Sequence, residues 1–200
     1  MITTENNESL VGIALDLEKI KNALSSTINA KVHDDKKTKL AAVLVIIYGP
    51  EPSILMTERS KTMDHHAGEI SFPGGRWQCD DADLLSTALR ETSEEMGVDI
   101  PREQIVGQLK PVTTLNSGYT IAPFITIQEK IPLITPNHEI ESVLKIPLVP
   151  LLKTMDGDKD PAHRSIQEMF IFKFQNYLIW GASARMLNQI TVALSSNGLL

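Results

Sequence analysis

The 200-residue sequence has the length of one globular domain, and 42% of its residues are hydrophobic while 22% are charged. This balance excludes disordered, collagen-like and fibrous proteins. The formal net charge of −6 argues against a nucleic-acid-binding surface, because it repels a phosphate backbone. The longest apolar run, residues 40–48, is too short to cross a membrane. We therefore expect neither a nucleic acid nor a membrane among the partners.

The cysteine content and the first residues bear on the compartment. A single cysteine, Cys79, excludes an internal disulfide and fits a reducing environment. Residues 1–9 carry two glutamates and no basic segment followed by an apolar run, so no secretory signal is predicted. Together these features predict a cytoplasmic location or an equivalent reducing compartment.

The first predicted element is an amphipathic helix with Ser9 as its N-cap, because apolar residues recur at spacings of three and four: Leu10, Ile13, Leu17, Ile20 and Leu24. The next segment, residues 29–39, is polar and its charges cancel, which indicates a solvated loop. We therefore expect residues 1–38 to form an N-terminal helix and a linker that precede the main domain.

Short apolar runs predict strands over residues 40–48, 53–57 and 68–72, with a proline- and glycine-rich turn at 49–52. A helix is expected from about residue 81 to residue 96. Gly97 is placed to end that helix in the left-handed conformation.

The second half of the chain predicts strands over residues 105–114, 119–128 and 169–179, and the last of these alternates Phe170, Phe172 and Phe174 on one side. A helix over residues 182–194 closes the pattern. Strands mixed with helices in this order predict an α/β (α+β) fold with a mixed sheet flanked by helices.

The predicted helix over 81–96 carries Glu91, Glu94 and Glu95 within an arc of about 100°, separate from its apolar face. Like charges at these spacings repel, and a hard cation such as Mg²⁺ or Mn²⁺ would reverse that effect. An acidic helix face alone is most often simply solvated. Here a strand and the glycine pair Gly74-Gly75 precede the helix, and this layout favours a binding site.

The helix resembles the signature of the Nudix hydrolases, in which Arg-Glu-x-x-Glu-Glu-x-Gly precedes an aliphatic residue; the matching residues are Arg90, Glu91, Glu94, Glu95, Gly97 and Val98. Upstream, Gly75 and Asp81 are offset by one position from the general signature, and this offset resembles the coenzyme A pyrophosphatase branch. Further segments that resemble this branch are residues 55–60, 66–75, 117–119, 123–124, 139–147 and 179–184.

The resemblance implies a Nudix-like mixed β-sheet sandwiched between helices, with an extra N-terminal helix. It implies a Nudix hydrolase domain over residues 39–194 and a tail over 195–200. The implied reaction is Mg²⁺- or Mn²⁺-dependent hydrolysis of the pyrophosphate of coenzyme A or its derivatives, which yields adenosine 3′,5′-bisphosphate and phosphopantetheine.

Catalytic roles are expected for Glu91, Glu94 and Glu95 as metal ligands. Arg90 is expected to project away from the centre of the glutamate patch and to form an orienting ion pair with another acidic side chain. The general base is either one of the helix glutamates or Glu139 from a loop. Seven residues are expected to bind the substrate through phosphate contacts, close backbone approach or packing: Arg59, His66, Phe72, Gly74, Gly75, Arg76 and Tyr119.

Two departures from the coenzyme A pattern keep other readings open. Asp64 stands where that branch usually has an arginine, and Gln78 stands where it usually has an aspartate. An anion at position 64 would repel incoming phosphates. The substrate could therefore be another nucleoside diphosphate derivative, such as ADP-ribose or NADH, or a nucleotide triphosphate. A catalytically silent nucleotide sensor is the alternative outside the enzymes, and a homodimer stays open.

Overall fold

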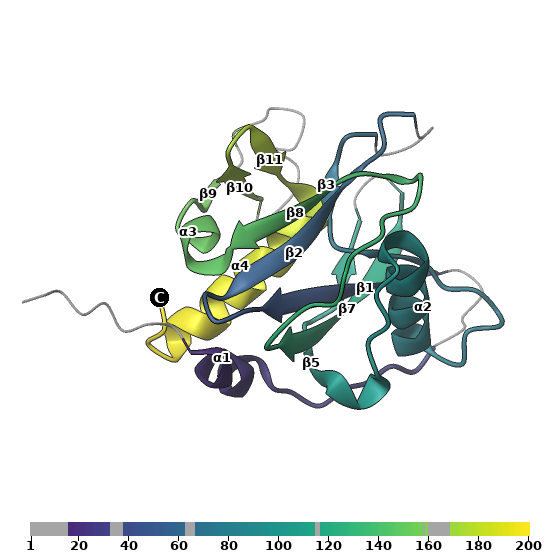
Figure 1. Cartoon of the computed structure of the whole chain (residues 1–200), viewed down its shortest axis with the longest axis horizontal. Helices are drawn as coiled ribbons and strands as arrows, with labels where there is room; N and C mark the ends of the chain where they lie inside the picture. The colour runs from purple at the N-terminus through teal and green to yellow at the C-terminus, as the bar shows by residue number, and fades with distance from the viewer. Residues whose placement is uncertain (1–15, 33–37, 63–66, 115–116, 158, 160–168) are drawn as a thin grey trace, which may run out of the picture.

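The computed structural model describes residues 16–32, 38–62, 67–114, 117–157, 159 and 169–200. In this part of the chain a mixed β-sheet lies between helices, which confirms the predicted α/β (α+β) class (Figure 1). No described helix combines the length and the apolar character that crossing a lipid bilayer demands. The predicted domain boundaries at residues 38/39 and 194/195 stay predictions.

The described helices are α1 (Leu17–Leu24), α2 (Leu84–Met96), α3 (Leu148–Leu152) and α4 (Gly181–Ser196), with a 3-10 turn at Arg102–Gln104. The described strands are β1 (Lys39–Tyr48), β2 (Ser53–Arg59), β3 (Ile70–Ser71), β4 (Gly74–Arg76), β5 (Ile105–Gln108), β6 (Val112–Thr113), β7 (Tyr119–Gln128), β8 (Ile140–Pro147), β9 (Asp156–Gly157), β10 (Phe170–Phe174) and β11 (Tyr177–Ile179).

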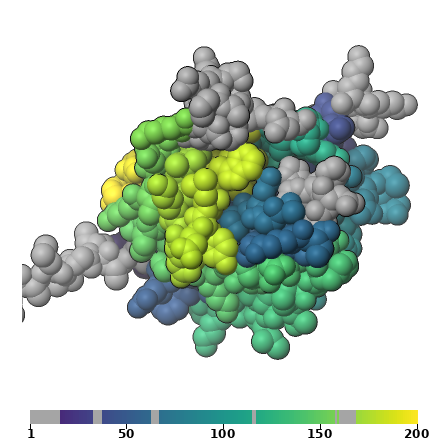
Figure 2. Space-filling view, turned by 90° about the horizontal axis from the view of Figure 1, so that it is seen from above, coloured from purple at the N-terminus to yellow at the C-terminus, as the bar shows by residue number. Residues whose placement is uncertain are grey.

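Strand β1 is the centre of the main sheet. It runs parallel to β7 along its whole length, from Lys39 opposite Tyr119 to Tyr48 opposite Gln128. On its other side it pairs antiparallel with β2 and with β4, and β2 in turn pairs with β3 and β8. A separate small sheet joins β9, β10 and β11, and the hairpin of β10 and β11 lies beside β3 (Figure 2).

Alternating side chains of β1 build two cores, one on each face of the sheet. Val43, Val45 and Ile47 pack on the face that α1, α3 and α4 cover. Ala42, Leu44 and Ile46 pack on the face that α2 covers. Burial on both faces explains why β1 is an almost unbroken apolar run in the sequence.

Helix α2 has caps at both ends. The Asp83 carboxylate accepts a hydrogen bond from the Ser86 N–H at 2.8 Å, which satisfies one free amide of the first turn. Gly97 ends the helix with φ of +65°, and its N–H donates to the Ser93 carbonyl at 2.8 Å. The predicted left-handed C-cap at Gly97 is therefore confirmed.

The N-terminal helix differs from its prediction. It begins at Leu17, and its N-cap is Asp16, whose carboxylate accepts from the Glu18 N–H at 3.0 Å. The predicted cap, Ser9, and the first two apolar positions lie outside the described residues. The rest of the predicted apolar face is confirmed, because Ile20 and Leu24 are buried in the same core as α4.

Two predicted strands are interrupted in the structure. The strand predicted over 105–114 is divided into β5 and β6, because three residues, 109–111, lie opposite only two residues of β7 and Pro111 has no N–H to donate. The strand predicted over 169–179 is a hairpin of β10 and β11, which turns at Gln175 with φ of +51°. Phe172 of β10 is fully buried, with Phe170 and Phe174 packed against the same core.

Besides the 3-10 turn at Arg102–Gln104, four elements were missing from the prediction: β4, β8, α3 and β9. Strand β4 has only three residues, two of them glycines, so it carries no apolar pattern of its own. Strand β8 alternates buried and exposed residues and pairs with β2. The helix α3 has five residues, too few for a helical periodicity to be recognised.

Candidate active site

The site is built around β4, where the backbone approaches its neighbours too closely for a side chain. Gly74 has φ of +148°, and a Cβ at this position would lie 2.3 Å from the Ala42 carbonyl oxygen of β1. Its N–H donates to Glu95 Oε2 at 3.0 Å. Only glycine therefore fits here, and its amide fixes the carboxylate of Glu95.

The next residue leaves room for a second carboxylate. A Cβ at Gly75 would lie 2.4 Å from Cδ of Glu91 and 2.5 Å from both of its carboxylate oxygens. The Glu91 carboxylate thus rests directly on the backbone of β4. The glycine pair brings two glutamates of α2, one helical turn apart, against one short strand.

Burial raises the proton affinity of both glutamates. Glu95 is 4% exposed, and desolvation raises its pKa to about 7, although the Gly74 hydrogen bond and Arg59 act in the opposite direction. Burial also raises the pKa of Glu91, against the effect of Arg90. The neighbouring carboxylates, Glu139 among them, raise both values further, so the site concentrates negative charge.

Arg59, the last residue of β2, joins two of these carboxylates. Its guanidinium lies 3.6 Å from Glu95 Oε1 through one terminal nitrogen and 3.6 Å from Glu139 Oε2 through the other. The register between β2 and β8 shifts between Glu58 and Arg59, which is a bulge at the point where the strand meets the site. A loop carboxylate and a helix carboxylate are therefore held by one cation.

The loop that carries Glu139 is anchored on the C-terminal end of α2. The N–H groups of Thr135 and Asn137 donate to the carbonyls of Met96 and Glu95, at 2.8 and 2.9 Å. These carbonyls belong to the last turn of the helix and have no partner within it. The Asn137 side chain then accepts from the Glu139 N–H at 2.9 Å, so the helix end sets the position of Glu139.

Arg90 is the centre of a hydrogen-bond network. It forms a bidentate ion pair with Asp81, at 2.8 and 2.9 Å, and its Nη1 donates to Glu91 at 3.0 Å and to Glu94 at 3.1 Å. The hydrogen bonds from Arg90 lower the pKa of Asp81 to about 2, against the opposing effect of burial. The predicted ion pair of Arg90 with another acidic side chain is therefore present, with Asp81 as the partner. The side chain does not project away from the glutamate patch as expected, because its Nη1 bridges Glu91 and Glu94.

As the side chains lie, no three acidic, histidine or cysteine residues of the described ranges form a metal-binding group. Arg90 holds Glu91 and Glu94, while Arg59 and the Gly74 amide hold Glu95. The expected metal ligands therefore share one helix face, yet each is directed at a basic or amide group of the protein.

The expected substrate-binding residues have different surroundings. Tyr119 lies under two cations, with Arg76 Cζ 5.3 Å and Lys39 Nζ 5.5 Å from the ring centroid. Phe72 is 3% exposed and belongs to the core on the α4 face, so the structure leaves its ring little open surface, and its packing on a ligand stays a prediction. His66, like the divergent Asp64, lies outside the described residues.

Sequence reasoning gave no role in the site to two residues that the structure adds to this region, Asp81 and Lys39, although Asp81 is part of the family resemblance. The sequence offers a hint of the pair with Asp81, because this acidic residue stands near the start of the helix, nine positions before Arg90. Only the fold of the chain before the helix brings the two side chains into contact. No sequence pattern points to Lys39, because its partner Tyr119 is far away in sequence.

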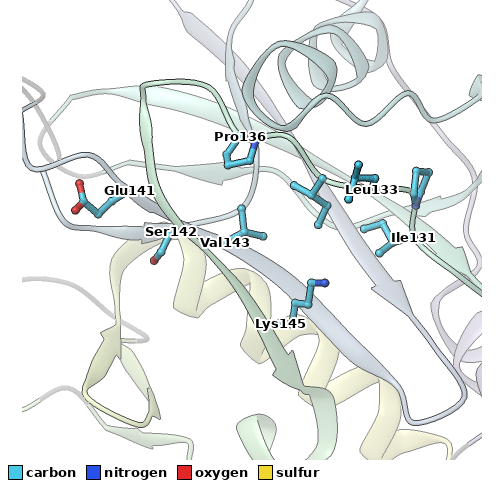
Figure 3. Close-up of a pocket in the computed structure, with 9 residues that line it drawn as sticks. Ile131, Leu133, Pro136, Glu141, Ser142, Val143 and Lys145 are labelled. Carbon is cyan, nitrogen blue, oxygen red and sulfur yellow. The ribbon is translucent and has the colours of Figure 1, made fainter.

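A shallow apolar groove of about 700 Å³ lies next to the Glu139 loop (Figure 3). Residues 131–134 and Pro136 form one side, and residues 141–143 and Lys145 of β8 form the other. None of the glutamates or arginines described above lines it. The groove is therefore separate from the carboxylate cluster.

Known proteins resemble this chain in sequence and in fold. The sequence pattern of the NUDIX domain matches residues 38–168. Proteins named as the uncharacterized Nudix hydrolase NudL, from Yersinia pestis (strain Pestoides F) and Yersinia pseudotuberculosis serotype O:1b, are 33% identical over 159 residues, which are 78% of this chain and 79% of theirs. The crystal structure of a MutT/nudix family protein from Enterococcus faecalis superimposes with a TM-score of 0.59.

That structural match has 13% sequence identity and covers 83% of this chain and 65% of the Enterococcus chain, so it bears on the fold alone. The match to the domain pattern and the identity with the Yersinia proteins each cover well over half of the chain. The chain therefore belongs to the Nudix hydrolase family.

Proposed function

We propose that the chain hydrolyses the diphosphate bond of a nucleoside diphosphate derivative, with coenzyme A or its derivatives as the substrate. The observation that carries this proposal is the convergence of Glu91 and Glu95 from α2, Arg59 from β2 and Glu139 from a loop on the Gly74-Gly75 backbone. Segments distant in sequence meet there to gather carboxylates that have no role in the hydrophobic core.

The donor set fits a hard divalent cation, and Nudix hydrolases generally use divalent metal ions. The absence of a Cβ at Gly75 leaves the Glu91 carboxylate room to lie on β4. Burial and mutual repulsion raise the pKa of Glu91 and of Glu95 despite the nearby arginines, so a further cation would stabilise the two ionised carboxylates. Glu91, Glu94 and Glu95 would hold Mg²⁺ or Mn²⁺ after turning from Arg90 and Arg59. At such a site the ion supplies charge neutralisation for the diphosphate oxygens and activation of the attacking water.

The chain's own residues orient these groups. Asp81 anchors Arg90, and Arg90 in turn restrains the carboxylates of Glu91 and Glu94 at the helix surface. Arg59 keeps Glu139 close to Glu95. We assign Glu139 as the proton acceptor, since its side chain is 37% exposed and can reach a water, whereas Glu95 is enclosed.

The choice of coenzyme A is supported by the segments that resemble its pyrophosphatases, which include Arg59, the Gly74-Gly75 pair and Tyr119. Asp64 favours the second candidate, a substrate with fewer phosphates such as ADP-ribose, because it would repel an additional anionic group. A silent sensor is less well supported, since Glu91, Glu94 and Glu95 are all present on one helix face.

A substrate panel tests the proposal. Full-length protein is incubated with coenzyme A, dephospho-coenzyme A, ADP-ribose, NADH and a nucleoside triphosphate, each with Mg²⁺, with Mn²⁺ or with EDTA, and the products are separated by chromatography. We expect adenosine 3′,5′-bisphosphate and phosphopantetheine from coenzyme A, only with metal. Faster hydrolysis of ADP-ribose would replace coenzyme A by the second candidate, and no product from any substrate would contradict an enzymatic role.

A further inference from the structure

A second group of charged side chains lies at the same end of the sheet as the glutamate cluster. Lys39 begins β1, Arg76 ends β4 and Tyr119 begins β7. Lys39 and Tyr119 are register partners, and Arg76 is the partner of Ala41, two positions further along β1. Side chains two apart on a strand share a face, so all three residues lie on one face of the sheet.

The two cations stand over one aromatic ring. Lys39 Nζ and Arg76 Cζ are 5.5 and 5.3 Å from the centroid of Tyr119, which is half-buried between the strands. The ring face attracts each charge and restrains two otherwise flexible side chains. This arrangement brings together two positive charges that would repel one another without a partner of opposite sign.

Neither cation has a carboxylate partner in the described ranges. Lys39 donates one hydrogen bond, to the Ser117 carbonyl at 3.3 Å, and Arg76 makes no side-chain hydrogen bond to any described residue. Both side chains are exposed, so their remaining N–H donors are open to a ligand. In a chain with a net charge of −6, an exposed and unneutralised pair of cations suits an anion.

The pair also lies close to the carboxylates. Along β1, Val43 and Ala42 face Gly74 and Gly75, Ala41 faces Arg76, and Lys39 faces Tyr119. Four positions of a strand extend about 13 Å, which is comparable with the length of a nucleotide. Arg76 joins the two regions, because its carbonyl accepts a hydrogen bond from Arg90 at 3.3 Å while its guanidinium lies over Tyr119.

We propose that Lys39, Arg76 and Tyr119 form a second anion subsite, which binds a phosphomonoester on the nucleoside of the substrate while the glutamate cluster acts on the diphosphate. The cations would contact the phosphate oxygens, and the tyrosine would keep them in place. This inference rests on the proposed function for the diphosphate end of the ligand. The subsite would let the protein select substrates that carry an additional phosphate far from the scissile bond.

The test compares two nucleotides that differ only in this group. Binding of adenosine 3′,5′-bisphosphate and of AMP is measured by isothermal titration calorimetry on full-length wild type and on the Lys39→Gln, Arg76→Gln and Lys130→Gln variants. Lys130 is a matched control, because it is exposed and follows the opposite end of β7 from Tyr119. Each variant removes one positive charge, and circular dichroism verifies its fold.

We expect wild type to bind the bisphosphate at least about tenfold more tightly than AMP, because the second phosphate would accept charge-assisted hydrogen bonds from Lys39 and Arg76. The preference should fall to within about twofold in Lys39→Gln and Arg76→Gln and persist in Lys130→Gln. No preference in wild type, or a preference that survives both substitutions, would overturn the subsite. Failure of the proposed function would give a different result: the substrate panel would yield no product, while the binding preference for the bisphosphate would remain.

Discussion

Glu95 has the most enclosed carboxylate on the acidic face of α2, with a backbone amide on one oxygen and Arg59 near the other. Replacement by glutamine keeps the size of the side chain and an oxygen for the Gly74 N–H, but removes the charge. We expect Glu95→Gln to fold normally and to lose at least about 100-fold in kcat, or about 2.7 kcal/mol of transition-state stabilisation.

Steady-state product release with Mg²⁺ measures this loss, and thermal unfolding measures the fold. Glu103→Gln is the matched control, because Glu103 is an exposed glutamate outside the cluster. Activity of Glu95→Gln within about twofold of wild type would remove Glu95 from the set of metal ligands.

The two glycines of β4 should respond differently to alanine. At Gly75 the added Cβ meets the end of the flexible Glu91 side chain, so we expect a small change in stability and a loss of at least about tenfold in kcat/KM as the carboxylate is displaced. At Gly74 the Cβ meets the backbone of β1, at a positive φ, and unfolding should become easier by about 2 kcal/mol or more.

Chemical denaturation and kinetics on Gly74→Ala, Gly75→Ala and the control Gly157→Ala separate these effects. Gly157 has open space around its Cβ position and no positive φ, so its variant should match wild type. A Gly75→Ala protein with full activity would show that the contact with Glu91 has no part in catalysis.

At the scale of elements, the start of α2 depends on the pair formed by Asp81 and Arg90. Because hydrogen bonds from Arg90 lower the pKa of Asp81 to about 2, the folded state favours the ionised carboxylate. The stabilisation is present above the ordinary pKa of aspartate, near 4, and is lost as the pH falls towards 2. The shift corresponds to about 2 kcal/mol.

We expect Asp81→Asn to lower the free energy of unfolding at pH 6 and to flatten its decline between pH 5 and about 2.5, relative to wild type. Urea titrations across this range measure both quantities. The control is Asp80→Asn, since Asp80 is exposed and has no contact with Arg90. An unchanged slope in Asp81→Asn would mean that another group accounts for the loss of stability in acid.

At the scale of the whole molecule, α1 belongs to the same core as the sheet and α4. Ile20 is fully buried and Leu24 is 4% exposed, both within the core on the α4 face. We therefore expect Leu24→Ala to cost about 2–4 kcal/mol in a single cooperative transition.

Urea unfolding followed by fluorescence and by circular dichroism tests this expectation. Val192→Ala on α4 is the control, because Val192 is 57% exposed and should change stability by less than about 0.5 kcal/mol. Two separate transitions in Leu24→Ala, or no loss of stability, would show that α1 and the sheet unfold independently.

Local patterns were enough to predict α2, its acidic face, the glycine that ends it, and the strands β1, β2 and β7. These features depend on residues close in sequence: helical spacing, a residue that tolerates a positive φ, and long apolar runs. Contacts between distant segments decided the rest. Pairing with β1 makes a strand of Gly74–Arg76, and the fold buries Phe72, brings Arg59 and Glu139 to Glu95, and places Lys39 beside Tyr119. No periodicity encodes these contacts, because they depend on strand register and on how the loops lie over the end of a helix.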